Sequence, residues 1–91
     1  MIIRYLKFRK STMKKDEVQQ LLERFGFSLS LSKKIGTTGL SHIMHSNGSA
    51  GRVVEYKLNE AVGTIESALG FNDGGLVNFS STSALETWLN G

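Results

Sequence analysis

The spacing of hydrophobic residues changes along the chain, and the first two patterns predict a strand followed by a helix. Residues 2–8 (IIRYLKF) are rich in β-branched and aromatic types and predict a strand with apolar groups on both faces. Four apolar residues then follow the i, i+3, i+4, i+7 spacing of an amphipathic helix. They are Val18, Leu21, Leu22 and Phe25.

The predicted helix has candidate caps at both ends. Thr12 or Asp16 can serve as the N-cap, because a hydroxyl or carboxylate oxygen accepts hydrogen bonds from the free backbone amides of the first turn. Gly26 suits the left-handed conformation that commonly ends a helix, with Phe27 folding back onto the last turn.

Three strands joined by short turns are predicted next. In residues 27–32, three apolar residues alternate with three serines, which is the period of a half-buried strand. Residues 40–45 (LSHIMH) and 52–58 (RVVEYKL) predict two more strands, and Asn47-Gly48 between them is a hairpin signal. The three strands are expected to form an antiparallel meander.

Residues 59–70 predict a second helix. Its narrow apolar stripe contains Ala61, Ile65 and Ala68, and Gly70 can end it as Gly26 ends the first helix. Gly63 inside this segment weakens a helix by about 1 kcal/mol relative to alanine.

The last elements are a short strand at 76–80 and a helix at 81–91. Ser83 and Glu86 have the spacing of a capping box, and the apolar residues after them include Trp88. The whole chain of 91 residues therefore predicts one α+β domain. We expect a mostly antiparallel sheet with helices on one face and the order β-α-β-β-β-α-β-α.

Composition narrows the class of protein. The chain has no cysteine, and its apolar runs are far shorter than the roughly 20 residues that cross a bilayer. Its start is too charged for a signal peptide, so a cytoplasmic protein without membrane contact is expected. Neither a phosphate-binding loop nor a dinucleotide fingerprint occurs, and no cofactor is expected.

The net charge of +3 is unevenly distributed. Residues 1–34 carry nine basic and three acidic groups, a net of +6, whereas residues 35–91 carry two and five, a net of −3. A basic face that includes Lys14 and Lys15 could contact phosphates. Alternatively, the two oppositely charged halves attract each other within the fold.

The two histidines of the chain, His42 and His45, are the candidates for chemistry. Residues three apart on a strand point to opposite faces, which argues against one metal ion bound by both. Histidine can act as a general base near neutral pH, and lysines can hold a phosphate, so a metal-independent endoribonuclease is conceivable. The alternative is that His42 packs beside Leu40 and Met44 and that His45 is solvated at the turn.

A resemblance favours the RNA hypothesis. Residues 13–27 (MKKDEVQQLLERFGF) resemble the opening helix of the HicA family of messenger-RNA interferase toxins. The segment from Lys33 and Lys34 to Gly39-Leu40-Ser41-His42 is similar to that family's basic residues and Gly-Ser-His step. The resemblance implies a double-stranded-RNA-binding-like (dsRBD-like) core over 13–71, to which 1–12 and 72–91 are added.

The same resemblance implies roles and partners. His42 would be the catalytic residue, Lys33 and Lys34 would contact RNA phosphates, and an antitoxin would be a protein partner. The sequence leaves open whether the chain is catalytic at all.

The alternative is a small binding protein without catalysis. The tail FSSTSALETWLNG is similar to ends of compact phage and mobile-element proteins, including some anti-CRISPR inhibitors. Such a protein would bind a protein partner, with Trp88 either as an exposed anchor or in the core. A homodimer through the first strand is also conceivable, because both of its faces are partly apolar.

Overall fold

The computed structural model describes residues 13–72 and 74–91, which form one small α+β domain. The predicted first strand at 2–8 lies outside the described residues. The elements in chain order are α1 (Lys15–Arg24), β1 (Ser28–Ile35), β2 (Leu40–Asn47), β3 (Arg52–Asn59), β4 (Thr64–Asn72), β5 (Gly75–Phe79) and α2 (Thr82–Asn90). Neither described helix is long and apolar enough to cross a membrane.

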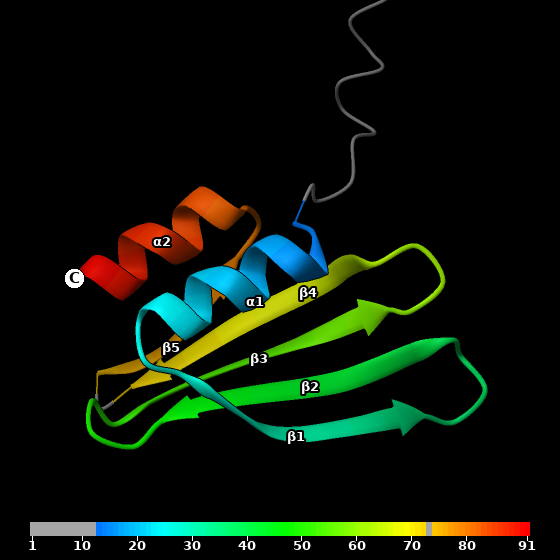
Figure 1. The fold of residues 1–91 in the computed structure, drawn as a ribbon, viewed down its shortest axis with the longest axis horizontal. Coiled ribbons are helices and arrows are strands. Elements are labelled where there is room, and N and C mark those ends of the chain that lie inside the picture. Colours follow the sequence, from blue (N-terminus) through cyan, green and yellow to red (C-terminus); the bar gives the residue numbers. More distant parts are fainter. Residues whose placement is uncertain (1–12, 73) are drawn as a thin grey trace, which may run out of the picture.

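The five strands form one antiparallel sheet in the order β1-β2-β3-β4-β5. Each strand pairs with the next along the chain, so the sheet is a simple meander. Both helices lie on the same face, and in the described part of the chain nothing covers the other face (Figure 1). The prediction of a mostly antiparallel sheet with helices on one face is confirmed.

The hydrophobic core fills the space between the helices and the sheet. Val18, Leu21 and Leu22 of α1 are buried there, as the predicted helical stripe requires. Alternate residues of the central strands face the same core, because side chains of a strand point to its two faces in turn. The strand residues of the core include Ile43, Val54, Tyr56, Leu58, Ile65, Ala68 and Phe79.

The C-terminal end of α1 agrees with the prediction, but the N-terminal cap does not. Lys14 is the N-cap and supplies no side-chain bond, while Asp16 lies inside the first turn, so Asp16 is not the cap. The other predicted cap, Thr12, lies outside the described residues. At the C-terminal end Gly26 has φ +84°, and the Phe27 amide donates to the Leu22 carbonyl at 2.9 Å, as predicted.

The predicted second helix is wrong, because residues 64–72 form strand β4. The turn before it contains Gly63, whose φ of +71° suits a tight turn. Within β4 the pairing with β3 shifts, since Lys57 pairs with Ser67 and Leu58 with Ile65. The extra residue places the core-facing Ile65 and Ala68 three apart, which imitates helical spacing.

The observed order over the described residues is therefore α-β-β-β-β-β-α rather than the predicted α-β-β-β-α-β-α. The α-β-β-β-α core that the resemblance implied for 13–71 is not formed, because a fourth strand stands in place of its second helix.

A second irregularity lies in β1. The register with β2 shifts between Leu29 and Leu31, so these two leucines face opposite sides of the sheet instead of sharing a face as predicted. The Ser30 hydroxyl lies in this bulge and donates to the Met44 carbonyl at 3.2 Å. A side-chain bond thus holds β1 to β2 where the backbone ladder is interrupted.

Helix α2 lies within the predicted range 81–91, but its N-cap differs from the prediction. Ser81 is the N-cap and accepts from the Ala84 amide at 3.1 Å, so the predicted capping box at Ser83 is not formed. Trp88 is partly buried and packs against the core. Its position supports the core interpretation of Trp88 over that of an exposed anchor.

Candidate functional site on the open face of the sheet

We call the side of the sheet that carries no described helix the open face. Strand alternation and pairing assign most of its members from all five strands. They are Leu31, Lys33, Ile35, Leu40, His42, Met44, Val53, Glu55, Lys57, Leu69, Phe71, Leu76 and Asn78. Ser46, Asn59 and Ser67 lie on the same face, so apolar and polar residues are mixed there. An antiparallel sheet usually turns a polar side to solvent, so the aliphatic and aromatic residues on this face make it a candidate binding surface.

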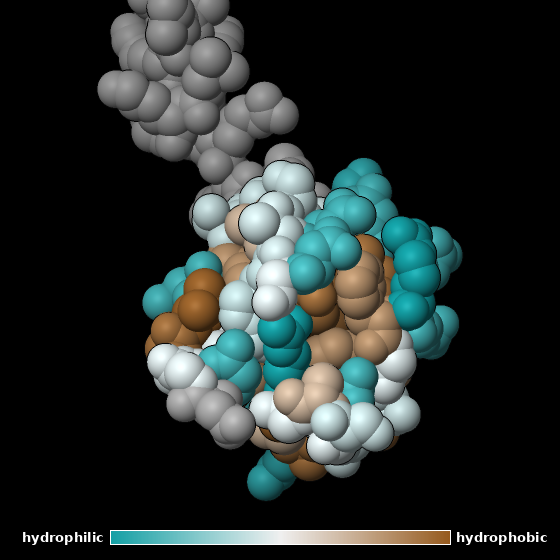
Figure 2. Space-filling model, turned by 90° about the vertical axis from the view of Figure 1, so that its left-hand side faces the viewer, coloured by the Kyte–Doolittle hydropathy of each residue, from teal (hydrophilic) through white to brown (hydrophobic). Residues whose placement is uncertain are grey.

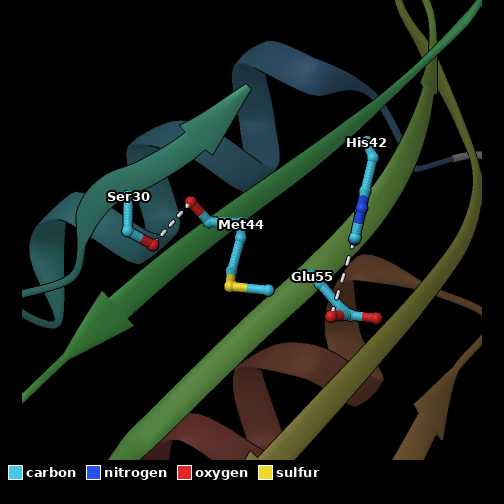
Figure 3. Close-up of polar contacts among 4 residues, drawn as sticks. All are labelled: Ser30, His42, Met44 and Glu55. Atoms are coloured by element: carbon cyan, nitrogen blue, oxygen red, sulfur yellow. Dashed lines mark hydrogen bonds and ion pairs between the residues drawn. The ribbon is translucent and has the colours of Figure 1, made fainter. Parts of the chain in front are cut away.

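A histidine and a carboxylate form a pair near the centre of the open face. His42 on β2 points toward Glu55 on β3, and its Nε2 lies 3.5 Å from a carboxylate oxygen of Glu55 (Figure 3). The two side chains remain 34% and 22% exposed. A ligand on this face can therefore reach both the imidazole of His42 and the carboxylate of Glu55.

Two lysines flank this pair. Lys33 on β1 and Lys57 on β3 are the register partners of His42 on either side, and both are exposed. Directly opposed residues of paired strands have Cβ atoms about 5 Å apart. The three residues thus form a row across the sheet, with Ser67 of β4 next in line. We call Lys33, His42 and Lys57 the cationic row.

The other lysines predicted to bind RNA are separated from this row. Lys34 pairs with Ser41 and lies on the helix side of the sheet. Lys15 lines a cavity of about 130 Å³ on that same side, between α1 and the first strands. Lys14 bridges to Thr64, which places it at the far edge of the open face. Of the five predicted residues, Lys33 and His42 are the pair that face each other on neighbouring strands.

Glu55 and Lys57 belong to the site but were not predicted from the sequence. Their alternation with buried residues of β3 was visible, but the pairing register that puts them beside His42 was not. The turn from β2 to β3 contains residues 48–51, and Asn47 pairs with Arg52. A two-residue turn at Asn47-Gly48 would have given another register and other neighbours.

His45 is buried, not solvated as one interpretation of the sequence had it. It is 3% exposed, its Nε2 lies 2.9 Å from the Tyr56 hydroxyl, and the two rings stack. Its Nδ1 has no hydrogen-bond partner among the described residues. Burial lowers the pKa of His45, although the charge of Glu23 opposes the shift, and burial raises the pKa of Tyr56 to about 12.

The buried pair predicts how stability depends on pH. As pH falls below 6.5, the unfolded chain protonates His45 before the folded chain does, so the free energy of unfolding decreases. As pH rises above 10, the unfolded chain ionises Tyr56 first, and stability falls again toward pH 12. The contribution of His45 and Tyr56 to the free energy of unfolding is therefore largest between about pH 6.5 and 10.

Urea unfolding at pH 5 to 8 tests the acid side of this prediction. The loss below pH 6.5 approaches at most about 1.4 kcal/mol per pH unit for one group. His45→Leu should remove that part of the slope, with His42→Gln as the matched control. An unchanged slope in His45→Leu would show that other groups cause the acid loss.

Within the described residues no group of three His, Cys, Asp or Glu side chains is placed to hold a metal ion. Comparison with protein-family models, with curated proteins and with solved structures gives no match for this chain.

Proposed function

We propose that this protein is a small RNA-binding protein whose open face cleaves RNA without a metal ion, with His42 as the general base. The observation that carries the proposal is the row Lys33–His42–Lys57 with Glu55 beside the histidine. A proton acceptor between two cations on an accessible surface suits a phosphodiester that has a neighbouring hydroxyl.

The chemistry is a transesterification. His42 takes the proton from the ribose 2′-hydroxyl, and the 2′-oxygen bonds to phosphorus. The bond from phosphorus to the 5′-oxygen breaks, and that oxygen leaves with a proton from water. The products are a 2′,3′-cyclic phosphate and a 5′-hydroxyl. Glu55 stabilises the imidazolium formed at His42, and the two lysines stabilise charge on the phosphate oxygens.

The charge of the chain predicts modest affinity for RNA. Residues 13–91 carry seven basic and eight acidic groups, a net charge of −1, whereas residues 1–12 carry four basic groups and no acidic one. Phosphate contacts on the open face thus depend on Lys33 and Lys57. Each contact with single-stranded RNA adds about −0.7 to the slope of log affinity against log salt concentration.

Neighbouring lysines on opposite faces allow a sharp test of this surface. Lys33→Ala is expected to weaken binding to a fluorescent unstructured RNA and to reduce the salt slope by about 0.7. Lys34→Ala, on the helix side, should leave both quantities unchanged. Fluorescence anisotropy from 20 to 300 mM salt measures them. Equal effects of the two variants would reject the open face as the RNA surface.

The cleavage proposal is tested on the same RNA in the presence of EDTA. Wild-type protein should yield fragments ending in a 2′,3′-cyclic phosphate, which mass spectrometry identifies. A toxin of the HicA kind should also arrest growth when expressed, and His42→Gln should relieve the arrest. Intact RNA and unaffected growth would together reject the enzyme proposal.

A second candidate is the non-catalytic protein-binding role. The observation that favours it is the exposed aliphatic area on the open face, where Leu31 is 37% and Leu76 is 53% exposed. Figure 2, which views the end with the β2–β3 and β4–β5 turns, shows hydrophobic residues reaching the surface between hydrophilic ones. Binding of a purified protein partner that ignores salt and is lost in Leu31→Arg would support this role.

A further inference from the structure

A second part of the open face, separated from the cationic row by the row that contains Glu55, is apolar. Val53, Phe71 and Leu76 are register partners on β3, β4 and β5, and they form a second row across the sheet. Leu76 is 53% exposed and Phe71 is partly exposed. Apolar side chains that remain exposed to water in this way often mark a binding site, and this row suits a flat apolar ligand.

Phe71 differs from the other aromatic residues that the structure describes. Phe27, Tyr56 and Phe79 are buried in the core, and Phe25 and Trp88 pack against it. Among the described phenylalanine, tyrosine and tryptophan residues, Phe71 is thus the one on the open face. Its ring lies on the side of the sheet away from the helices and does not pack against them. A partly exposed ring on the same face as exposed lysines is the usual platform for a stacked base.

The distance to the histidine pair fits such a role. Leu69 is the register partner of Glu55, and Phe71 follows two residues later on the same face. Diagonal neighbours of this kind are about 7–8 Å apart. The cationic row itself meets β4 at Ser67, four residues before Phe71, which is roughly 13 Å along the strand. Two extended nucleotides span a similar length, so a phosphate at the cationic row places a base about two nucleotides away over the Phe71 ring.

We infer that Phe71, with Leu76 beside it, forms a stacking subsite for one unpaired base about two nucleotides from the bond that His42 attacks. This inference rests on the proposed function, and it adds a residue that fixes the position of the RNA strand relative to His42. A base inside a duplex cannot lie on this ring, because its faces are already stacked on neighbouring bases. The subsite therefore requires a locally unpaired RNA strand.

The test combines a protein variant with a modified RNA. Phe71→Leu keeps an apolar side chain but removes the ring, and should weaken binding to a 10-nucleotide unstructured RNA roughly 5- to 100-fold. Phe71→Tyr keeps the ring and should bind as the wild type does. Leu29→Ala, an exposed aliphatic residue on the helix side, is the control for loss of apolar surface. Thermal unfolding verifies that each variant is folded.

A series of RNAs with one abasic ribose at successive positions locates the stacked base. At one position the missing base should weaken wild-type binding about as much as Phe71→Leu does, and it should have no further effect on Phe71→Leu. A penalty at every position that persists in Phe71→Leu would overturn the stacking subsite. So would equal binding of the same sequence annealed to its complement.

The two proposals fail separately in this experiment. If the wild type binds unpaired RNA and Lys33→Ala weakens it while Phe71→Leu does not, the RNA function stands and the stacking subsite is rejected. If the wild type binds none of the RNAs, the proposed function itself is rejected.

Discussion

Replacement of His42 by glutamine is expected to slow RNA cleavage by about 100- to 10,000-fold, the range that a positioned general base contributes. Glutamine keeps a polar side chain of similar reach beside Glu55 but cannot take up the proton of the 2′-hydroxyl. Because His42 is 34% exposed and lies outside the core, the substitution should leave the fold intact. Binding to RNA should change much less than the cleavage rate.

Single-turnover cleavage with enzyme in excess measures this effect without interference from product release. The same RNA carrying one 2′-deoxyribose at the cleaved position should be resistant, because it lacks the attacking hydroxyl. If His42→Gln cleaves at the wild-type rate, His42 is not the base, and any cleavage comes from another group or from a contaminating nuclease.

Glu55 is expected to act through His42 and is thus a positioning residue. Glu55→Gln should slow cleavage less than His42→Gln, and the two substitutions combined should cost little more than His42→Gln alone. Glu60→Gln is the matched control, since Glu60 is a carboxylate on another surface that accepts from the Ser41 hydroxyl at 2.6 Å. Additive losses from Glu55 and His42 would mean that the carboxylate acts independently.

The sequence predicts the individual strands of this sheet better than their mutual arrangement. Alternation identifies β2 and β3, because their buried residues are apolar except for Ser41 and His45, which are hydrogen-bonded to Glu60 and Tyr56. The neighbours of His42 depend on the register, which is set by the length of the turn between the two strands. The His42–Glu55 pair was therefore half predictable, since His42 was visible in the sequence and its partner was not.

The segment of β4 was mistaken for a helix for a similar reason. One extra residue in the pairing with β3 shifts the alternation, and the apolar spacing then changes from two to three. Local patterns cannot distinguish a bulged strand from one turn of an amphipathic helix. Gly63 was the available signal, because a glycine inside a helix is unfavourable whereas one in a turn before a strand is ordinary.

Gly70 of β4 predicts the largest effect on stability. A Cβ atom added there would lie 2.7 Å from Cε2 and 2.8 Å from Cζ of Phe79, and 3.1 Å from Cη2 of Trp88. Real Cβ atoms almost never approach other atoms so closely, so a ring has to move. We expect Gly70→Ala to lower the free energy of unfolding by about 3 kcal/mol, at the upper end of the usual range for overpacked cores.

Neither ring can move cheaply. Phe79 is 6% exposed and meets Trp88 edge to face at 5.4 Å between ring centroids. The Arg52 guanidinium lies 4.6 Å from the Trp88 ring centroid, and its Nη1 donates to the Trp88 carbonyl at 3.0 Å. A shift of Trp88 would disturb these contacts together. Insertion of one methyl group therefore acts on the whole junction between β3, β4, β5 and α2.

Thermal unfolding measures the prediction, and about 3 kcal/mol corresponds to a fall in Tm of roughly 12–24 °C for a domain of this size. Gly48→Ala is the control, because Gly48 lies in the β2–β3 turn, lacks a positive φ and has no atom within 4 Å of an added Cβ.

Phe79→Leu should restore part of the stability in the Gly70→Ala background although it destabilises the wild type, because it removes the two closest ring atoms. If the double variant is no more stable than Gly70→Ala alone, the contact with Phe79 is not the cause. Gly70 faces the helix side, so whatever fraction of Gly70→Ala stays folded should keep the open face and its RNA binding.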